Sequence, residues 1–520
     1  MSPTTAGLGK YDFSINCRNC DQDFPELRPC EITGLLPSWL TGSLIYNGPG
    51  KNVVGQTRYK HTFDSSAILQ KFEINNGEVL YNNRFLASKV FESNQATGKI
   101  TKAEFGTPVA NTKGTFARIF DAMDPEKMFS DNALVNVVEM GGKYYALAET
   151  PFMFQICPST LKVLDRVNVN KEIGLMTQCP HPIKDNDGYY YTIGQGVSVS
   201  GPKYNIIRFP ENGDISNGKV MTSVTPRMRL TPSYMHSMGI TENYIILVEQ
   251  PLRVSMKQIV SDIMNNSPFI DGMKWTNESV LIHLISRKTW KPIKTRYVSD
   301  PFFFMHIVNC YEEDGHIILD IPMYKDSTIL HNMFIDKIQA QSGINEPEFV
   351  ESFQPHLRRL VIPVNTEGKG NLVKLNDTQC TAAWKNHEVF LRYEEKCSYP
   401  MDNPEINPTY QSKKYRYTWA MGPNPDGSSS GFVVKVDLKE NKHFTWSEPG
   451  LYTSSPVFIP KPGSQEEDDG ILGVLLLSPT DNQYVSLLFL DASDLRELAR
   501  ATIIMPGTIP MPLHGSYIQA

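Results

Sequence analysis

Hydrophobic and polar residues alternate in short runs along most of the chain. Two runs joined by a Gly-Gly pair fill residues 134–149 (LVNVVEMGGKYYALAE), and two more meet at an Asp-Gly pair in residues 306–321 (HIVNCYEEDGHIILDI). Alternation with a period of two, broken by a short turn, is typical of β-hairpins. The pattern recurs in residues 280–290, 431–438 and 470–492. Strands do not alternate with helices, so we expect antiparallel hairpins and no parallel sheet.

Two stretches follow the helical period instead. Apolar residues three and four positions apart predict an amphipathic helix over residues 255–265. Its apolar stripe consists of Met256, Ile259, Val260, Ile263 and Met264. A second helix is indicated by the spacing of Leu330, Phe334 and Ile338. We therefore expect helical insertions near residues 252–266 and 328–343.

Composition supports a turn-rich β protein. The 520 residues include 36 prolines and 35 glycines. These residues interrupt the chain about once every seven positions, which is too often for long helices. We predict an all-β chain with about fifteen to twenty strands. Length alone would suggest about three domains, but closed β architectures also form single large units. A sandwich, a barrel and a propeller with long, divergent blades all remain open at this point.

Charge and targeting signals exclude some classes of protein. The 50 basic and 56 acidic residues give a net charge of −6 without a long basic run, which argues against nucleic-acid binding. No window resembles a membrane span, and residues 1–14 lack the pattern of a signal peptide. These features predict a cytoplasmic protein. The eight scattered cysteines are then expected to be reduced thiols.

Four of the eleven histidines stand in similar contexts, each after an apolar residue or a proline. They are His181, His236, His306 and His514. Their spacings are 55, 70 and 208, and the last is close to three times 69. Such intervals would arise if each histidine lay on the inner strand of a propeller blade about 60 to 70 residues long. All four would then point at one axis, as metal ligands must. The alternative for each is an ordinary buried, hydrogen-bonded histidine.

Motifs from end to end of the chain resemble the carotenoid cleavage oxygenase family, and most of all its animal branch with the insect carotenoid isomerooxygenases. The motifs are LPSWLTGSLIYNGPG (36–50), FDSSAILQKF (63–72), EFGT (104–107), SDNALVNV (130–137), YYALAET (144–150), EEDDGILGVLLLSP (466–479), FLDASDLRELARA (489–501) and the closing HGSY, together with the four histidine segments. The resemblance implies a single seven-bladed β-propeller over residues 1–520, with a cap of loops and helices above an axial iron. It also implies that the four histidines bind Fe(II). Four neutral imidazoles would leave two octahedral positions open.

The resemblance further implies carboxylates that hydrogen-bond the histidines from behind. One falls on Glu149, which without the resemblance would be read as a surface charge at a strand end. A second falls on Asp402, one methylene shorter than the usual glutamate, so Glu405 is an alternative. At the third position Ser455 replaces a glutamate. We therefore expect His514 to lack an anionic partner and to be a weaker or more mobile ligand, or to meet a serine or water instead.

The resemblance implies that Fe(II) and dioxygen split one polyene double bond of a carotenoid into two aldehydes, and that this cleavage is coupled to trans-to-cis isomerisation. A rigid polyene needs an apolar tunnel past the metal. Candidate tunnel residues are Phe63, Ala148, Tyr234, Phe304 and Met305. Aromatic faces there could stabilise positive charge on the polyene by cation–π attraction. Ala148 takes the place of a threonine found in the retinoid isomerohydrolase, which leaves room for dioxygen.

The substrate must leave a membrane, so we expect a peripheral, monotopic contact with the membrane surface. The stripe from Met256 to Met264 is the candidate patch, with residues 110–129 as an addition. Alternatively, that helix packs its stripe on the propeller. Two other functions stay open: a retinyl ester isomerohydrolase that uses the same iron without dioxygen, and a non-catalytic carotenoid-binding propeller. The cleaved bond, the product isomer, the preference for hydroxylated carotenoids and the oligomeric state are left open.

Overall fold

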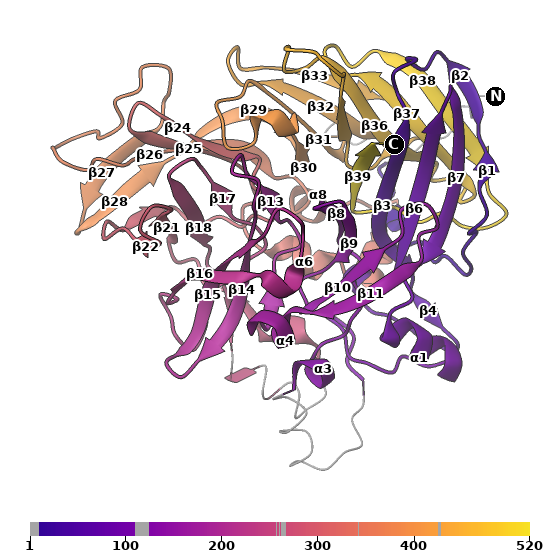
Figure 1. Ribbon diagram of the computed structural model, residues 1–520, viewed down its shortest axis with the longest axis horizontal. Coiled ribbons are helices and arrows are strands. Elements are labelled where there is room, and N and C mark those ends of the chain that lie inside the picture. The colour runs from indigo at the N-terminus through magenta and orange to yellow at the C-terminus, as the bar shows by residue number, and fades with distance from the viewer. Residues whose placement is uncertain are drawn as a thin grey trace.

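The computed structural model describes residues 10–109, 124–255, 257–258, 261, 267–341, 343–424 and 428–519. In this part of the chain short strands predominate and form sheets arranged around a centre (Figure 1). Six sheets of four to six strands are antiparallel throughout, and a further sheet of seven strands includes one parallel pairing. The prediction of an all-β propeller is confirmed.

The first three sheets use the N-terminal half of the chain and the last strand. One sheet orders β1 (Arg28–Pro29), β7 (Glu78–Phe85), β6 (Ser66–Asn75), β3 (Gly42–Lys51) and β39 (His514–Gln519). The next orders β11 (Val163–Asn168), β10 (Phe152–Ile156), β9 (Lys143–Leu147) and β8 (Asn136–Met140). The third joins β12 (Thr177–Gln178) and β13 (Ile183–Lys184) to β14 (Tyr190–Ser198), followed by β15 (Gly201–Phe209) and β16 (Lys219–Val224).

The mixed sheet takes most of its strands from the chain that follows these three sheets and its last two strands from farther along. Its path is β17 (Gly239–Ile240), β18 (Tyr244–Glu249), β21 (Val280–Ser286), β23 (Tyr297–Ser299), β28 (Glu388–Arg392) and β27 (Thr381–Lys385), with β22 (Lys291–Pro292) paired to β21. The pairing of β23 with β28 is parallel, contrary to the expectation of a purely antiparallel protein. This pairing joins segments about ninety residues apart in sequence, and such long-range contacts leave no local pattern.

Three C-terminal sheets complete the ring. The first orders β24 (Asn309–Glu313), β25 (His316–Met323), β26 (His356–Pro363) and β29 (Glu394–Pro400). The second orders β30 (Asp402–Glu405), β31 (Tyr417–Pro423), β32 (Gly431–Asp437) and β33 (Lys442–Ser447). In the third, β34 (Tyr452–Thr453) and β35 (Val457–Pro460) pair with β36 (Gly470–Leu477), which is followed by β37 (Tyr484–Asp491), β38 (Glu497–Ile504) and β2 (Glu31–Gly34). Thus β39 completes the first sheet and β2 the last. In Figure 1 the indigo strands accordingly lie beside the yellow ones.

The two predicted hairpins are confirmed. Residues 134–149 contain β8 and β9 around a Gly-Gly turn, and residues 306–321 contain β24 and β25 around an Asp-Gly turn. Both residues of each turn have positive φ, which glycine and aspartate tolerate best.

The expected number of strands is too low, because the described chain holds 39. Many of them span only two or three residues, too short to show alternation in sequence.

Helices and small hairpins occupy the connections. The helices are α1 (Lys89–Thr97), α3 (Pro125–Met128), α4 (Val169–Ile173), α6 (Thr328–Asn332), α7 (Ile335–Ala340) and α8 (Pro347–Glu351). The 3-10 turns are η1 (Phe13–Cys17), η2 (Thr62–Asp64), η3 (Ile215–Asn217), η4 (Phe269–Gly272) and η5 (Pro408–Tyr410), and two-stranded sheets pair β4 (Val53–Val54) with β5 (Thr57–Arg58) and β19 (Leu252–Val254) with β20 (Met273–Trp275). Among the described helices, none is long and apolar enough to cross a membrane.

The predicted helix over 328–343 is two helices, α6 and α7. The backbone between them pairs with another segment: Thr62 N–H donates to the Met333 carbonyl, and His61 forms a β-bridge with Phe334. A helix cannot continue through residues whose backbone groups are used in this way. The other predicted insertion begins as a strand, β19, and all five residues of its apolar stripe lie outside the described residues.

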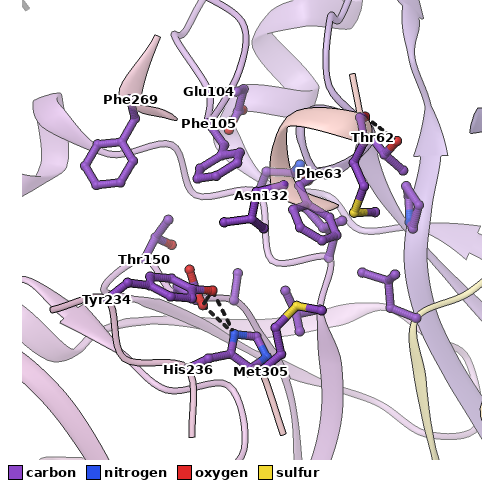
Figure 2. A pocket seen from close by; sticks show the side chains of 18 of the residues that line it. Thr62, Phe63, Glu104, Phe105, Asn132, Thr150, Tyr234, His236, Phe269 and Met305 are labelled. Carbon is purple, nitrogen blue, oxygen red and sulfur yellow. Dashed lines mark hydrogen bonds and ion pairs between the residues drawn. The ribbon is translucent and has the colours of Figure 1, made fainter. Parts of the chain in front are cut away.

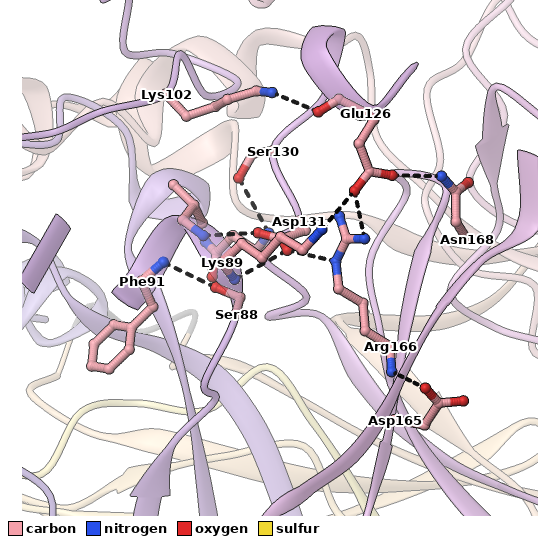
Figure 3. A network of polar contacts seen from close by, with 12 residues as sticks. Ser88, Lys89, Phe91, Lys102, Glu126, Ser130, Asp131, Asp165, Arg166 and Asn168 are labelled. Atoms are coloured by element: carbon pink, nitrogen blue, oxygen red, sulfur yellow. Dashed lines mark hydrogen bonds and ion pairs between the residues drawn. The ribbon is translucent and has the colours of Figure 1, made fainter. Parts of the chain in front are cut away.

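A polar network fixes the segment that precedes β8 (Figure 3). The Arg166 guanidinium, from β11, donates to Asp131 Oδ2 and to Glu126 Oε1, both at 2.7 Å. Asp131 also accepts from the first two backbone N–H groups of α1, at Lys89 and Val90. The carboxylate therefore stabilises the positive end of that helix while it binds Arg166. The network connects α1, α3 and β11 around residues 124–131.

Candidate metal centre and cavity

The structure brings the four predicted histidines together. His181 lies between β12 and β13, His236 and His306 stand just before β17 and β24, and His514 opens β39. Each position is at the inner edge of a different sheet. Five of the six pairs of imidazole rings have centroids 4.7 to 5.1 Å apart. Four sheets therefore direct one histidine each at a common point.

The ring nitrogens converge as closely as the rings do. One nitrogen each of His181, His306 and His514 lies within 4.8 Å of the other two. His236 completes the cluster, because its Nε2 lies 3.2 Å from Nε2 of His181. Imidazole nitrogens at these separations can bind one ion between them.

Glu149 lies behind His236. Its Oε1 accepts from His236 Nδ1 at 2.6 Å and also from the Tyr234 hydroxyl. A carboxylate can only accept, so Nδ1 of His236 carries the proton and Nε2 keeps its lone pair. Glu149 follows β9 in the loop to β10, and its side chain is turned toward the cluster.

Asp402, at the start of β30, accepts a hydrogen bond from His306 in the same way. Its Oδ1 accepts from His306 Nδ1 at 2.7 Å, and its Oδ2 accepts from the Tyr324 hydroxyl at 2.5 Å. Burial alone would raise the pKa of Asp402, but His306 and Tyr324 together hold it below its ordinary value. Glu405, the alternative, accepts from Phe458 N–H instead, and burial raises its pKa to about 8. The shorter aspartate therefore reaches the histidine.

His181 and His514 have no such carboxylate among the described residues. Nδ1 of His181 lies 3.3 Å from the side-chain amide of Asn136, which belongs to β8. Ser455, between β34 and β35, donates to the carbonyl of Leu513 at 3.0 Å rather than to the ring of His514. The serine hydroxyl binds the backbone beside the histidine.

The electrostatics keep these two histidines neutral. Burial, and then the positive charge that neighbouring histidines would carry, lower the pKa values of His181 and His514 well below the ordinary value. A neutral imidazole has the lone pair that a metal ion requires.

The cluster therefore fits a divalent first-row metal ion. His306 Nε2 is buried and has no hydrogen-bond partner among the described residues. A buried polar atom without a partner costs free energy, unless a ligand absent from the protein chain satisfies it. The Nδ1 hydrogen bonds of His236 and His306 already direct their other nitrogens toward the cluster. Four imidazoles without a direct carboxylate suit iron, cobalt, nickel, copper or zinc better than calcium or magnesium.

A cavity of about 760 Å³ opens onto the cluster and is lined mostly by apolar side chains. Four of the five predicted tunnel residues line it: Phe63, Ala148, Tyr234 and Met305. Figure 2 shows Phe63 and Phe105 on one side and Tyr234, His236 and Met305 on the other. Its volume is within the range of about 300–1,000 Å³ typical of ligand pockets.

Phe304, the fifth predicted tunnel residue, does not line the cavity. It is completely buried in a core cluster with Phe302, whereas Phe303 and Met305 belong to the cluster beside the cavity. Successive side chains of an extended backbone point to opposite faces. The run of three phenylalanines therefore alternates, and Phe304 falls on the side away from the metal centre.

The sequence was compared with those of known proteins. The family described as retinal pigment epithelial membrane protein matches residues 17–519. The carotenoid isomerooxygenase of Galleria mellonella is 36% identical over 98% of this chain and 96% of its own. The β,β-carotene 15,15′-dioxygenase of Mus musculus is 32% identical over 95% and 90% of the two chains.

The chain belongs to the carotenoid oxygenase family.

The solved structures of carotenoid oxygenases show the same fold. Cobalt-substituted apocarotenoid oxygenase of Synechocystis superposes with a TM-score of 0.76 at 20% identity, over 98% of each chain. At this identity the likeness concerns the fold alone.

Several residues of this carotenoid oxygenase site were not among those predicted from the sequence. Tyr324, which binds Asp402, directly follows a strand and carries no motif. Asn136 lies in a quoted motif but was not expected near His181. Phe105 and Phe269 line the cavity; Phe105 belongs to the EFGT motif, a signal that could have singled it out.

The candidate membrane patch cannot be placed. All five of its residues, Met256, Ile259, Val260, Ile263 and Met264, and most of residues 110–129 lie outside the described residues. Residues 126–129 at the described end of that second segment line the cavity, as do its neighbours Val109 and Ser130.

Proposed function

We propose that this chain is an oxygenase that splits one double bond of a carotenoid with dioxygen, giving two aldehydes, and that cleavage is coupled to trans-to-cis isomerisation. The observation that carries the proposal is the cluster of four imidazoles at the wall of an apolar cavity. Relatives named carotenoid isomerooxygenase and β,β-carotene 15,15′-dioxygenase support the substrate and the reaction. The reaction balances without a reductant, because one C=C bond and one O₂ become two C=O bonds.

The metal is proposed to be Fe(II), held by His181, His236, His306 and His514. When bound, iron would supply activation of dioxygen. Glu149 and Asp402 keep Nδ1 of their histidines protonated, so Nε2 of each would be the atom that binds the metal. Both carboxylates also offset the positive charge of the site without entering it.

The cavity wall is proposed to hold the polyene. Phe63, Phe105 and Tyr234 offer aromatic faces that bind an extended apolar chain and exclude water. The same faces attract positive charge that develops on the polyene, which would allow a neighbouring bond to rotate before the double bonds re-form. Phe303 stacks on Tyr234 with centroids 6.4 Å apart and supports the orientation of that ring.

Ala148 favours an oxygenase over an isomerohydrolase. It precedes Glu149 and lines the cavity, where its methyl group leaves space beside the histidines. A threonine at this position would narrow that space and place a hydroxyl group in it.

Peripheral contact with a membrane surface is proposed for uptake of the substrate. Among the described residues, four of the exposed large apolar side chains lie near one another: Val197, Val199, Met228 and Leu230. They lie at the turn between β14 and β15 and just beyond β16, which pairs with β15. Exposed apolar residues gathered at one end of a sheet are typical of docking surfaces. Replacing both Ile259 and Ile263 with Glu should abolish liposome flotation, and unchanged flotation would contradict the stripe's role.

We also infer that the mixed sheet counts as a blade, which with the six antiparallel sheets gives the seven expected of one domain over residues 1–520. The positions of the histidines support this count. His236 lies at the inner edge of the mixed sheet, just as the other three histidines lie at the inner edges of antiparallel sheets. The helices α6, α7 and α8 and the hairpin of β19 and β20 are proposed as parts of the cap. Leu330, at the cavity wall, supports that assignment.

The central test is an assay of the purified, iron-loaded protein with all-trans β-carotene or zeaxanthin under air. Chromatography should detect aldehydes, including a cis isomer. The same protein without oxygen should form no product, and a retinyl ester should not be hydrolysed. Activity on the ester without oxygen would establish the isomerohydrolase instead. Absence of both bound iron and product would indicate a binding protein.

A further inference from the structure

The hydroxyl group of Tyr324 connects the cavity wall to the carboxylate behind His306. It donates to Asp402 Oδ2 at 2.5 Å, while Asp402 Oδ1 accepts from His306 Nδ1 at 2.7 Å. Tyr324 is only 4% exposed and lines the cavity. The two donors therefore occupy both oxygens of one carboxylate and fix its plane.

The backbone of Tyr324 is attached to the segment that carries His306. Phe303 N–H donates to the Tyr324 carbonyl at 3.1 Å, and Tyr324 N–H donates to the Phe303 carbonyl at 2.8 Å. Their rings lie 5.6 Å apart. Phe303 stands three residues before His306, so the contacts from His306 through Asp402 and Tyr324 return to the histidine's own segment. A closed network of contacts of this kind limits the movement of every residue in it.

The equivalent group behind His236 is built differently. Glu149 receives both donors, His236 Nδ1 and the Tyr234 hydroxyl, on the single oxygen Oε1. Loss of the Tyr234 hydroxyl would leave the bond between Glu149 and His236 in place. Asp402, with one methylene fewer, depends on Tyr324 to hold the oxygen that His306 does not use. Without it the carboxylate keeps His306 and the backbone N–H of Asn403 as donors, and its rotation about the Cβ–Cγ bond is less restricted.

We infer that Tyr324 is a positioning residue, which holds the short side chain of Asp402 in the orientation that fixes His306 toward the metal. This inference rests on the proposed metal centre and assigns a task to a residue outside the histidine and carboxylate set. The hydroxyl acts through Asp402 and does not touch the metal.

The test is a titration of the metal-free, full-length protein with Co(II), followed by the visible d–d spectrum. Tyr324→Phe keeps the ring and removes the hydroxyl. It should weaken Co(II) binding by more than about threefold but by less than the roughly 10- to 100-fold typical when a ligand's direct partner is lost, and it should change the d–d spectrum. Tyr234→Phe should weaken it less. Tyr297→Phe is the control, because Tyr297 is buried outside the cavity and its hydroxyl donates to the Pro363 carbonyl at 2.7 Å.

A second background separates positioning from general loss of packing. With Asp402→Glu the longer side chain can hold His306 without help from Tyr324, as Glu149 holds His236, so adding Tyr324→Phe should then cost less than about threefold in affinity. An unchanged affinity in Tyr324→Phe, an equal loss in Tyr297→Phe, or a full loss in the Asp402→Glu background would each overturn the inference. If the wild-type protein binds neither cobalt nor iron, the proposed metal centre fails instead, and the two failures are distinguishable.

Discussion

The four histidines form two pairs that differ in the hydrogen-bond partners of their rings. His236 and His306 each donate to a carboxylate that also accepts from a tyrosine, whereas His181 meets an amide and His514 has no carboxylate among the described residues. Two carboxylates balance the charge of a divalent cation, and a third would leave the site negative. The difference suggests that two rings are oriented in advance, while the other two can adjust to the metal and its open positions.

The largest effect should follow removal of a supported ligand. His306→Ala or His236→Ala should abolish iron binding and activity, because each also leaves a buried carboxylate without its partner. His514→Ala should retain measurable metal, since it leaves no such charge behind. Iron content and circular dichroism of the three variants provide the measurement. Equal losses in all three would show that the two pairs are equivalent.

The next effect concerns the carboxylates themselves. Glu149→Gln and Asp402→Asn should each lower iron affinity about 10- to 100-fold, because the amides hold Nδ1 of the histidine less firmly. Asn136→Ala, the matched change behind His181, should cost less. Competition with a metal chelator measures all three. A larger loss in Asn136→Ala would reverse the comparison.

A gain should follow when the missing carboxylate is supplied. Ser455 is buried, and its hydroxyl binds the carbonyl of the residue before His514. Ser455→Glu should tighten iron binding up to about tenfold, if the new carboxylate accepts from the His514 ring. Ser455→Gln, the neutral control, should not. Weaker binding in Ser455→Glu would show that the space beside His514 cannot hold a carboxylate.

The smallest effect is a dependence of stability on pH in the metal-free protein. Burial and neighbouring histidines lower the pKa values of His181 and His514, so below about pH 6.5 the unfolded chain binds more protons than the folded one. Stability should therefore fall as the pH drops below 6.5. Urea unfolding measures it. The double variant His181→Gln with His514→Gln should show a shallower slope, and an unchanged slope would contradict the assignment.

The meeting of the four histidines could be predicted because propeller blades repeat along the chain. Residues at equal depth in successive blades recur at blade-length spacing, and His181, His236 and His306 follow it. The resemblance to a family then identified Glu149 and Asp402. That Asp402 and not Glu405 meets His306 depends on the backbone of β30, whose pairing with β31 is irregular between these two residues. No one-dimensional pattern reports such a detail.

Other parts of the site could not be predicted, since they depend on which face of a strand a residue occupies or on pairing between distant segments. Three consecutive phenylalanines look equivalent in sequence, yet Phe304 faces the core and Phe303 the cavity side. Tyr324 reaches Asp402 across 78 residues of chain. The break between α6 and α7 arises from pairing with His61, far away in the sequence.

The pairing of β39 with β3 also bears on how the protein matures. It places His514 opposite Asn47, two residues separated by 467 positions. Contacts over such distances form slowly and late in folding. Three of the four proposed ligands would therefore be present in a partly folded chain before the fourth arrives. A metal ion bound by all four histidines would connect the first sheet to the later sheets. Uptake of the metal and closure of the ring of sheets would therefore be completed together.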